Sequence, residues 1–400
     1  MMNKRMMHTI SALAVLGLSG QSWAGGLYLY ELGTEDLGLA NAGSAARAQD
    51  ASIVANNPAG MTRLQGNQLT LGAQLLYADL DYTLENPNLN NSGNTGGWMP
   101  GASTFYSHSV NDDLKLGMAL YGNFGASLDF GDTWAGRHLV KEITLMGLTV
   151  QPSLAYRLNN TWSVGAGLGL NYGIFSLTRD RVRDGGEVES DDTDIAWNGK
   201  VGLLFEPAEH TRLGLVYTSK VDYSFDVDRI GTLPASDGSW ILPINLTVDA
   251  PQQVMFSAVQ VLNDKWSLLG EMGWQDWSSL SEEVSAGRVT QPSKVDVQDT
   301  WHGALGVQYQ LTTDTRLNVG LAYDSSMYND QDSISLTMPS GASWRIGTGV
   351  QHQLNDRSSL GAAVLYLLSE DGSVASPIPL AGSYDDPRMY FFSCNYSYRF

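Results

Sequence analysis

The sequence lacks the features that mark several classes of protein. It has a single cysteine, Cys394, so no internal disulfide can form. Its 23 Lys and Arg residues stand against 42 Asp and Glu, a formal charge of −19, which argues against a nucleic acid partner. No segment after the first 24 residues reaches the roughly 18 uninterrupted apolar residues of a spanning helix. If the mature chain enters a membrane, it must enter as a closed barrel, whose strands satisfy each other's backbone hydrogen bonds.

Motifs for catalysis and metal binding are also missing. The histidines are not spaced as a metal pair on one strand face or helix, and neither a G-x-S-x-G elbow nor an H-E-x-x-H motif occurs. We therefore expect no metal, no cofactor and no enzymatic activity, with an outer-membrane lipase as the enzymatic alternative. His302 is expected to be an inward-facing polar residue rather than a general base.

Residues 1–24 have the three parts of a secretory signal peptide. Lys4 and Arg5 precede an apolar stretch from Ile10 to Leu18, and Ser22-Trp23-Ala24 provides a small-x-small cleavage site. The apolar stretch is shorter than the roughly 20 residues that a membrane helix needs. We expect cleavage after Ala24, which would leave a mature chain of formal charge −21 because Lys4 and Arg5 are lost.

Residues 25–64 differ from everything that follows them. The segment is rich in small residues, shows no sustained alternation of apolar and polar positions, and breaks at Asn56, Asn57, Pro58, Ala59 and Gly60. Asn side chains beside a rigid proline can fix a turn by hydrogen bonds to the backbone. A compact irregular segment needs an enclosure for its backbone polar groups, so we interpret residues 25–64 as a plug inside a barrel formed by residues 65–400.

The rest of the chain alternates like β-strands. Turn signals divide it into an even number of segments, as in bacterial outer-membrane barrels. A barrel of this size encloses more room than eight strands do, and it would leak unless it were plugged. The predicted fold is therefore an all-β, fourteen-stranded antiparallel transmembrane barrel, with strands at 66–82, 97–107, 113–122, 144–158, 161–178, 193–206, 211–228, 246–261, 265–277, 297–310, 314–328, 343–353, 357–369 and 388–400.

The connections alternate in length. Short turns such as 159–160 and 311–313 follow the even segments, while long loops at 123–143, 179–192, 229–245 and 278–296 follow the odd ones. This asymmetry is typical of outer-membrane barrels, whose short turns are periplasmic. The acidic stretch from Asp184 to Asp194 is interpreted as a solvated outer loop, with cation bridging to lipopolysaccharide as the alternative.

Alternation also sorts side chains by face. In the segment 161–178, Trp162, Leu168 and Tyr172 share one face with other apolar residues, and Ser163 and Asn171 share the other with glycines. The apolar set is predicted to face lipid and the other set the lumen. Aromatic residues near the strand ends suit the interfacial girdles of such barrels: Trp162, Trp266, Trp301 and Tyr309.

Several motifs resemble one known family. The run from Gly25 through Asn57-Pro58-Ala59, the segments Asn123-Phe124-Gly125 and 155–160, and the terminal Phe400 are similar to the FadL family of outer-membrane channels for long-chain fatty acids and, in relatives, aromatic hydrocarbons. The resemblance covers the mature chain. It implies that the plug is a hatch, that Gly25, Leu27 and Tyr28 line the substrate pocket, and that these residues move when the pocket fills.

The resemblance also implies a lateral exit. Gly122, Asn123, Phe124 and Gly125 end the third predicted strand, where glycines commonly mark a bulge or a bend. An ordinary transition from strand to loop is the alternative. In the FadL family the third strand kinks inward and opens the barrel wall, so that a hydrophobic substrate leaves sideways into the membrane.

A fatty acid needs an apolar tunnel and one cation at its head group. Alternation places several basic residues inward, and Lys220 and Arg345 lie nearest the predicted outer loops. They are the candidates for the head group, with pairing to luminal acids such as Glu271 or Asp324, or holding the plug in place, as the alternative. Apolar residues of one outer loop are candidates for a capture groove: Leu233, Trp240, Ile241 and Leu242. The inward basic set is Arg157, Lys200, Arg212, Lys220, Arg316 and Arg345.

These observations predict a monomeric outer-membrane channel for passive uptake of hydrophobic molecules. Long-chain fatty acids are the first expectation, and aromatic or alkane hydrocarbons are the second. The expected partners are the substrate, outer-membrane lipid with lipopolysaccharide, and the barrel-assembly machinery, to which the terminal Phe400 would be the signal. A general porin, an adhesin and a phage receptor are the alternatives from other classes.

Overall fold

The structure is a computed structural model that describes residues 30–181, 186–232, 239–279, 282–286, 289–293, 296–375 and 380–400. For Asn123, for residues 227–246 and for 282–293 it describes no side chains. The predicted signal peptide and the first residues of the predicted hatch, including Gly25, Leu27 and Tyr28, lie outside the described residues.

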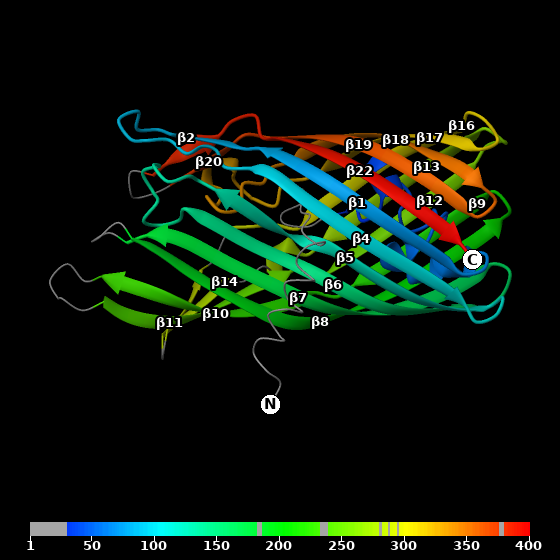
Figure 1. Ribbon diagram of the computed structural model, residues 1–400, viewed down its shortest axis with the longest axis horizontal. Coiled ribbons are helices and arrows are strands. Elements are labelled where there is room, and N and C mark those ends of the chain that lie inside the picture. The colour runs from blue at the N-terminus through cyan, green and yellow to red at the C-terminus, as the bar shows by residue number, and fades with distance from the viewer. Residues whose placement is uncertain are drawn as a thin grey trace.

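Fourteen antiparallel strands form a closed barrel (Figure 1). Each strand pairs with its neighbours around the barrel, and β1 pairs with β22 to close it, with Leu69 opposite Tyr398 and Ala73 opposite Cys394. The predicted fold and strand number are confirmed. In chain order the barrel strands are β1 (Gln68–Asp79), β4 (Gly97–Ser109), β5 (Leu114–Asp129), β6 (Glu142–Arg157), β7 (Trp162–Asp180), β8 (Glu187–Ala208), β9 (Thr211–Thr218), β12 (Gln253–Val261), β13 (Trp266–Gln275), β16 (Thr300–Gln310), β17 (Thr315–Asp324), β18 (Ser343–Asn355), β19 (Ser358–Ser369) and β22 (Arg388–Arg399).

Strand bounds differ from the prediction at the outer end. β5 continues to Asp129 and β8 begins at Glu187, so most of the described acidic stretch is strand rather than loop. The carboxylates of Asp192 and Asp194 accept hydrogen bonds from the backbone N–H groups of Asp226 and Ser224, at 2.6 and 2.8 Å. These acids cap the free edge of a neighbouring hairpin, which a charge pattern alone does not reveal.

Two small sheets extend beyond the barrel at the outer end. The predicted segments 211–228 and 246–261 each divide in two, because the chain leaves the wall after β9 and returns at β12. One sheet contains β10 (Val221–Thr232), β11 (Ser239–Ala250), β14 (Glu282–Ala286) and β15 (Val289–Ser293). The other contains β20 (Gly372–Val374), β21 (Gly382–Tyr384), β2 (Asp81–Leu84) and β3 (Gly93–Asn94).

The described part of residues 25–64 lies inside the barrel, near the end that holds the C-terminus (Figure 1). We call residues 30–64 the hatch. It contains two short α-helices and one 3₁₀-helix joined by turns: α2 (Thr34–Gly38), α3 (Ile53–Asn56) and η1 (Pro58–Arg63). Two further 3₁₀ turns, η2 (Trp277–Ser279) and η3 (Gln331–Ser333), lie in outer loops. No helix among the described residues is long and apolar enough to cross a membrane.

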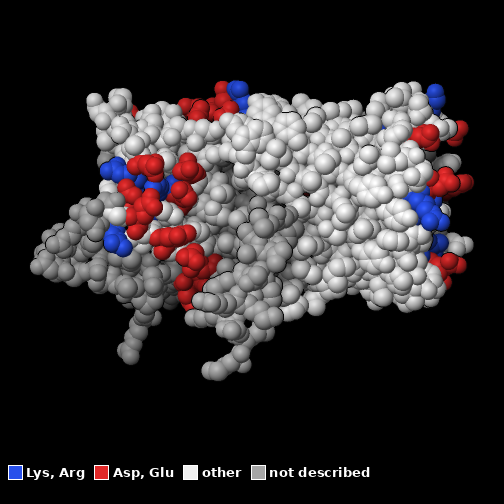
Figure 2. All heavy atoms as spheres, in the orientation of Figure 1, with Lys and Arg blue, Asp and Glu red and all other residues white. Residues whose placement is uncertain are grey.

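The outside of the barrel is a belt of exposed apolar side chains. Leu168 is 51% exposed and Leu305 72%, whereas inward-facing Asn171 is 1% exposed, as alternation predicts. Figure 2 shows the charged residues gathered at the two ends of the barrel on the face in view, with few in the middle. Aromatic pairs flank this belt, for example Trp266 with Tyr309 at 4.5 Å and Tyr323 with Trp344 at 5.0 Å. The belt is suited to the hydrocarbon core of a membrane.

Wall glycines allow the backbone of the hatch to approach closely. A methyl group on Gly320 would collide with the carbonyl of Leu39, and one on Gly347 with the carbonyl of Leu37. Both contacts are to backbone, which cannot rotate away as a long side chain can. The fit of the hatch therefore depends on these positions having no side chain.

Replacing Gly320 by alanine is expected to displace the hatch and raise the ion conductance of the barrel in planar bilayers, since overpacking of this kind costs about 1–3 kcal/mol. Gly303→Ala on the adjacent strand is the matched control, because a methyl group there has no described atom within 4 Å. Equal conductance of the two variants would show that the hatch does not depend on the Gly320 contact.

Candidate functional site

The candidate site is the hatch together with the inward-facing residues that hold it. One side chain, Asn57, organises the central turn of the hatch. Its Oδ1 accepts a hydrogen bond from the N–H of Ala59 at 3.1 Å, and its Nδ2 donates to the carbonyls of Ala45 at 2.7 Å and of Leu203 on the wall at 3.0 Å. Pro58 begins η1 directly after it, where its missing N–H costs nothing. Gly60 packs against Ile53, where a side chain would collide.

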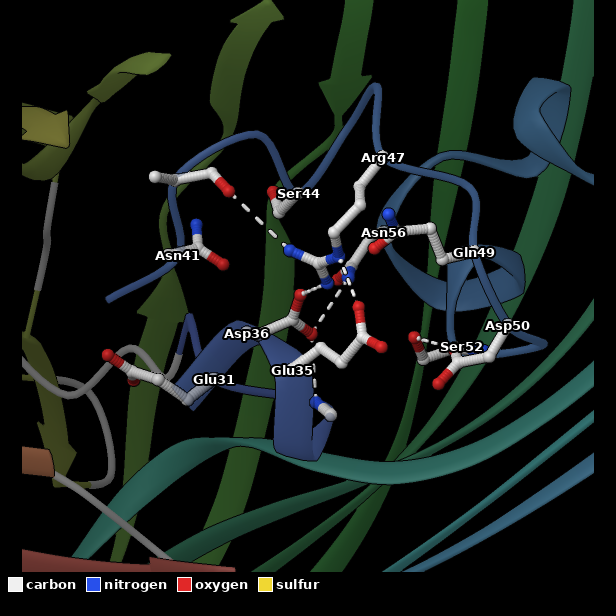
Figure 3. A network of polar contacts seen from close by, with 12 residues as sticks. Glu31, Glu35, Asp36, Asn41, Ser44, Arg47, Gln49, Asp50, Ser52 and Asn56 are labelled. Atoms are coloured by element: carbon white, nitrogen blue, oxygen red, sulfur yellow. Dashed lines mark hydrogen bonds and ion pairs between the residues drawn. The ribbon is translucent and has the colours of Figure 1, made fainter. Parts of the chain in front are cut away.

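A buried ion-pair network holds the two halves of the hatch together (Figure 3). Arg47 forms ion pairs with Asp36 and, at 3.1 Å, with Glu35. Asp36 also accepts hydrogen bonds from the N–H of Gly33 and from Nδ2 of Asn56, both at 2.9 Å. Burial alone would lower the pKa of Arg47, but the charges of Asp36 and Glu35 outweigh it and raise that pKa. Arg47 is therefore a permanent cation that compensates two buried carboxylates.

Asp50 lies where this network meets the periplasmic side. Its Oδ1 accepts hydrogen bonds from the N–H and the hydroxyl of Ser52, at 2.8 and 2.5 Å. Burial, and after it the negative charge of Glu35, raises the pKa of Asp50 to about 6. A polar hollow between the hatch and the wall reaches this residue and is lined by Gln49, Asp50, Arg316 and His352 among others.

The wall supplies hydrogen bonds and an ion pair to backbone and side-chain groups of the hatch. On β13, Glu271 accepts from the N–H of Ser44 and from Nδ2 of Asn41, both at 2.7 Å. On β6, Gln151 donates to the carbonyl of Val54 at 2.8 Å. Further attachments include Lys200 to the carbonyl of Ala55, Arg157 to the carbonyl of Thr62, Arg316 to Glu35, Thr62 to Ser163 and Thr34 to Ser393.

Arg345 has carboxylate partners on both sides. It forms ion pairs with Glu31 of the hatch at 2.5 Å and with Asp324 of β17 at 2.9 Å, and it is 1% exposed. The ring of Tyr30 lies 4.7 Å from the guanidinium and stacks on His302 at 4.5 Å. The sequence analysis predicted Arg345 as a candidate head-group cation near the outer loops. In this structure it pairs with Asp324, as in the alternative weighed with that prediction, and with Glu31 as a second anion.

Lys220 lies apart from Arg345. It follows the outer end of β9, is half exposed, and pairs with Asp222 at 2.6 Å, which raises the pKa of the lysine. No contact within the described residues joins it to Arg345. Each of the two predicted head-group cations thus has its own carboxylate partners in this structure.

The predicted capture groove lies mostly beyond what the structure describes. Leu233 is outside the described residues, and Trp240, Ile241 and Leu242 belong to β11, for which only the backbone is described at these positions. Their backbone pairs with Gly231, Ile230 and Arg229 of β10. The sequence suggested a loop here, whereas the chain forms a hairpin.

The third barrel strand separates from its neighbour. β5 pairs with β4 only as far as Leu120, opposite Thr104, but with β6 as far as Asp129. The β5–β6 register shifts between Gly122 and Phe124, so Asn123 is the extra residue of a bulge.

Gly125 has a φ of +145°, which favours glycine. Because the pairing of β4 with β5 ends at Leu120, the described backbone of the two strands shares no ladder pairing from there to the end of β5. At the outer end the N–H of Asp129 donates to the carbonyl of Thr95 at 2.9 Å, which closes the opening there.

Aromatic residues pack behind this separation. Phe124 is buried and stacks on Tyr223 of β10 at 5.9 Å. Tyr223 lies 6.0 Å from Phe225, which in turn lies 5.6 Å from Phe175 of β7. No sequence pattern indicates this cluster, because its members come from three strands that are far apart in the chain.

Comparison with known proteins places this barrel and its hatch in a family. Residues 15–400 match the family described as outer membrane protein transport protein (OMPP1/FadL/TodX). The chain belongs to the FadL/TodX family. It is similar to the long-chain fatty acid transport protein of Salmonella typhi, with 25% identity over 447 residues and all of both chains covered.

Solved structures share the fold. A Pseudomonas aeruginosa FadL homologue has a TM-score of 0.79 at 19% identity, covering 94% of this chain and 100% of the other. The Pseudomonas putida toluene transporter TodX has a TM-score of 0.71 at 16% identity, covering 95% and 100%. The protein is thus a bacterial outer-membrane β-barrel that transports hydrophobic compounds, and FadL-family channels are not enzymes. Within the described residues, no cluster of His, Cys, Asp or Glu could hold a metal ion.

Proposed function

We propose that this FadL-family channel takes up long-chain fatty acids without energy coupling. A fatty acid would be captured between the outer loops, where Leu233, Trp240, Ile241 and Leu242 remain the candidates. It would then enter the lumen, bind above the hatch and bias the hatch toward a displaced state. The relatives described as long-chain fatty acid transport proteins, matched along their whole length, support this choice of substrate.

The observation that carries the proposal is the separation of β4 from β5 beside the bulge at Asn123. A hydrophobic molecule that left downward would have to cross the polar attachments of the hatch and enter water. An exit through the wall delivers it directly to the hydrocarbon core, so partitioning can drive the transfer. We propose that Gly122, Asn123, Phe124 and Gly125 border this exit.

The hatch attachments support a role for Arg345 in holding the hatch rather than in binding substrate. Two carboxylates already balance the single positive charge of Arg345, so a third carboxylate would gain little attraction there. Releasing Glu31 from Arg345 would free the N-terminal end of the hatch, where Gly25, Leu27 and Tyr28 are proposed to line the pocket. Lys220 is proposed to attract anions at the outer rim.

An aromatic hydrocarbon is the second candidate substrate. The cluster of Phe124, Tyr223, Phe225 and Phe175 beside the proposed exit would stack on aromatic rings as readily as it would contact an acyl chain. A general porin fits poorly, because the hatch fills the lumen with buried side chains. We further propose that the protein acts as a monomer, is held by surrounding lipid and lipopolysaccharide, and reaches the membrane through the barrel-assembly machinery.

The substrate is tested by uptake of labelled oleate and labelled xylene at limiting concentration. The cells would lack their own channel and carry this one. We expect oleate uptake well above that of cells with an empty vector. Uptake of xylene alone would move the protein to the hydrocarbon candidate, and uptake of neither compound would contradict the transport proposal.

The exit is tested by Gly125→Leu. A side chain at this position would fill the separation between the strands and strain the backbone, so oleate uptake is expected to fall at least about tenfold. The amount of folded barrel, measured by its heat-modifiable migration in gels, must stay unchanged. Gly303→Leu on the outward face is the control. Normal uptake by a folded Gly125→Leu variant would rule out exit beside β5.

A further inference from the structure

Strand β10 begins against the inner face of the barrel wall, beside the proposed exit. We call its residues 221–226 the strap. Within the described residues no backbone ladder joins β10 to a barrel strand, and its long ladder, from Val221 opposite Ala250 to Thr232 opposite Ser239, is with β11. The strap is therefore attached to the wall by side chains rather than by sheet pairing.

Two carboxylates of β8 clamp the strap to the wall. Asp194 accepts a hydrogen bond from the N–H of Ser224 at 2.8 Å, and Asp192 accepts one from the N–H of Asp226 at 2.6 Å. Both hydrogen bonds are charge-assisted, but they are also exposed, so water can replace either partner. A clamp of this kind can be released without breaking the ladders that close the barrel.

Glycines of the wall make room for the ring of Tyr223. Gly147 of β6 and Gly173 of β7 lie directly opposite each other. A methyl group on Gly147 would lie 2.6 Å from the hydroxyl of Tyr223, and one on Gly173 would lie 2.5 Å from its ring. Tyr223 is 1% exposed, so its ring is buried directly on wall backbone. The same row of the wall continues to Phe124, opposite Gly147, and to Asp194, opposite Gly173.

Tyr223 also fixes a residue of the proposed exit. Its ring stacks on that of Phe124, with centroids 5.9 Å apart and planes inclined by 24°. Phe124 follows the bulge at Asn123, beyond the point where the pairing of β5 with β4 ends. Because Gly147 and Gly173 have no side chains, the Phe124 ring can move across this part of the wall once the Tyr223 ring has left it.

The ladder between β10 and β11 connects the strap with the proposed capture residues. It runs without a register shift from the strap to the backbones of Trp240, Ile241 and Leu242. Two strands paired along their whole length move together. A substrate that displaces the outer end of this hairpin therefore pulls on the clamp at Asp192 and Asp194.

We propose that Tyr223 is the positioning residue that holds the exit closed, and that release of the strap from Asp192 and Asp194 opens it. The inference rests on the proposed function and adds the residue that controls its exit step. In the closed state the Tyr223 ring fixes Phe124 beside the gap between β4 and β5. When the strap is released, the Phe124 ring moves into the vacated space and the substrate passes to the lipid.

The test separates the exit step from capture by measuring initial uptake of labelled oleate over a range of concentrations. Capture and luminal binding saturate at high concentration, so the exit step is expected to limit the maximal rate. Tyr223→Ala is expected to raise the maximal rate at least about threefold, because it removes one stacked aromatic contact, and to leave the half-saturating concentration unchanged. Tyr223→Phe keeps the ring and is expected to restore the maximal rate of the unaltered protein.

The control is Tyr217→Ala, which removes a tyrosine on the outer face of β9 that is 42% exposed. It is expected to change neither value. The cells would lack their own channel, and the amount of folded barrel would be measured by heat-modifiable migration in gels. Labelled xylene replaces oleate if the unaltered protein takes up xylene alone.

Each outcome decides a different point. An unchanged or lower maximal rate in a folded Tyr223→Ala variant would overturn the role of Tyr223, while uptake by the unaltered protein would leave the transport proposal standing. If the unaltered protein takes up neither compound, the transport proposal fails and the role of the strap fails with it. A rise that Tyr223→Phe shares would also overturn the inference, because the ring would then not be the group that holds Phe124.

A second variant applies if Tyr223→Ala does not fold. Asp192→Ala/Asp194→Ala releases the strap but keeps the ring, and it is expected to raise the maximal rate by the same factor of about three. An unchanged maximal rate in this folded variant would overturn the inference.

Discussion

The structure depends on the need to satisfy the polar groups of an irregular segment enclosed in a barrel. The hatch has only short helices, and although its turns pair many backbone groups internally, carbonyls such as those of Val54, Ala55 and Thr62 need partners from outside the segment. Inward-facing polar side chains of the wall provide them. Glu271 accepts from two hatch residues, and Gln151, Arg157 and Lys200 donate to hatch carbonyls. The polar lumen is thus the surface that holds the hatch rather than an aqueous path.

The need to satisfy the polar groups of the hatch connects the way the hatch closes the barrel with the way a substrate could pass it. Each attachment is a hydrogen bond or an ion pair, and such bonds can exchange one partner for another of similar chemistry. The apolar outer face of the barrel cannot take part in such an exchange of partners, because it faces lipid. In the proposed function, a substrate that carries its own carboxylate would compete for these attachments, while one without polar groups would act only through apolar contacts. In the proposed function, the separation of β4 from β5 would be the exit for the substrate.

Local patterns were sufficient to predict the barrel but not the hatch contacts. Alternation, turn lengths and the small-residue segment predict fourteen strands around a hatch, because these features depend on neighbours in the sequence. Strand alternation cannot tell a wall strand from an outer hairpin, so the predicted segment 211–228 merged β9 with β10. Asp324 was named as a possible partner of Arg345, but the pairing of Arg345 with Glu31 could not be predicted, since the two residues lie 314 positions apart in the sequence. The one sequence feature that could have indicated buried ion pairs in the hatch is the group of charged residues within this segment of small residues.

The central claim is that the hatch must move for the substrate to pass. Thr34 of α2 and Ser393 of β22 have their hydroxyl oxygens 2.7 Å apart, so the side chains of cysteines at these positions would be near enough for oxidative cross-linking to be attempted. The measurement is uptake of the transported compound by the Thr34→Cys/Ser393→Cys variant, with Cys394→Ser to remove the native thiol and the single Thr34→Cys variant as control. The account predicts that oxidation stops uptake and that reduction restores it. Uptake at the normal rate by the oxidised, cross-linked protein would contradict it.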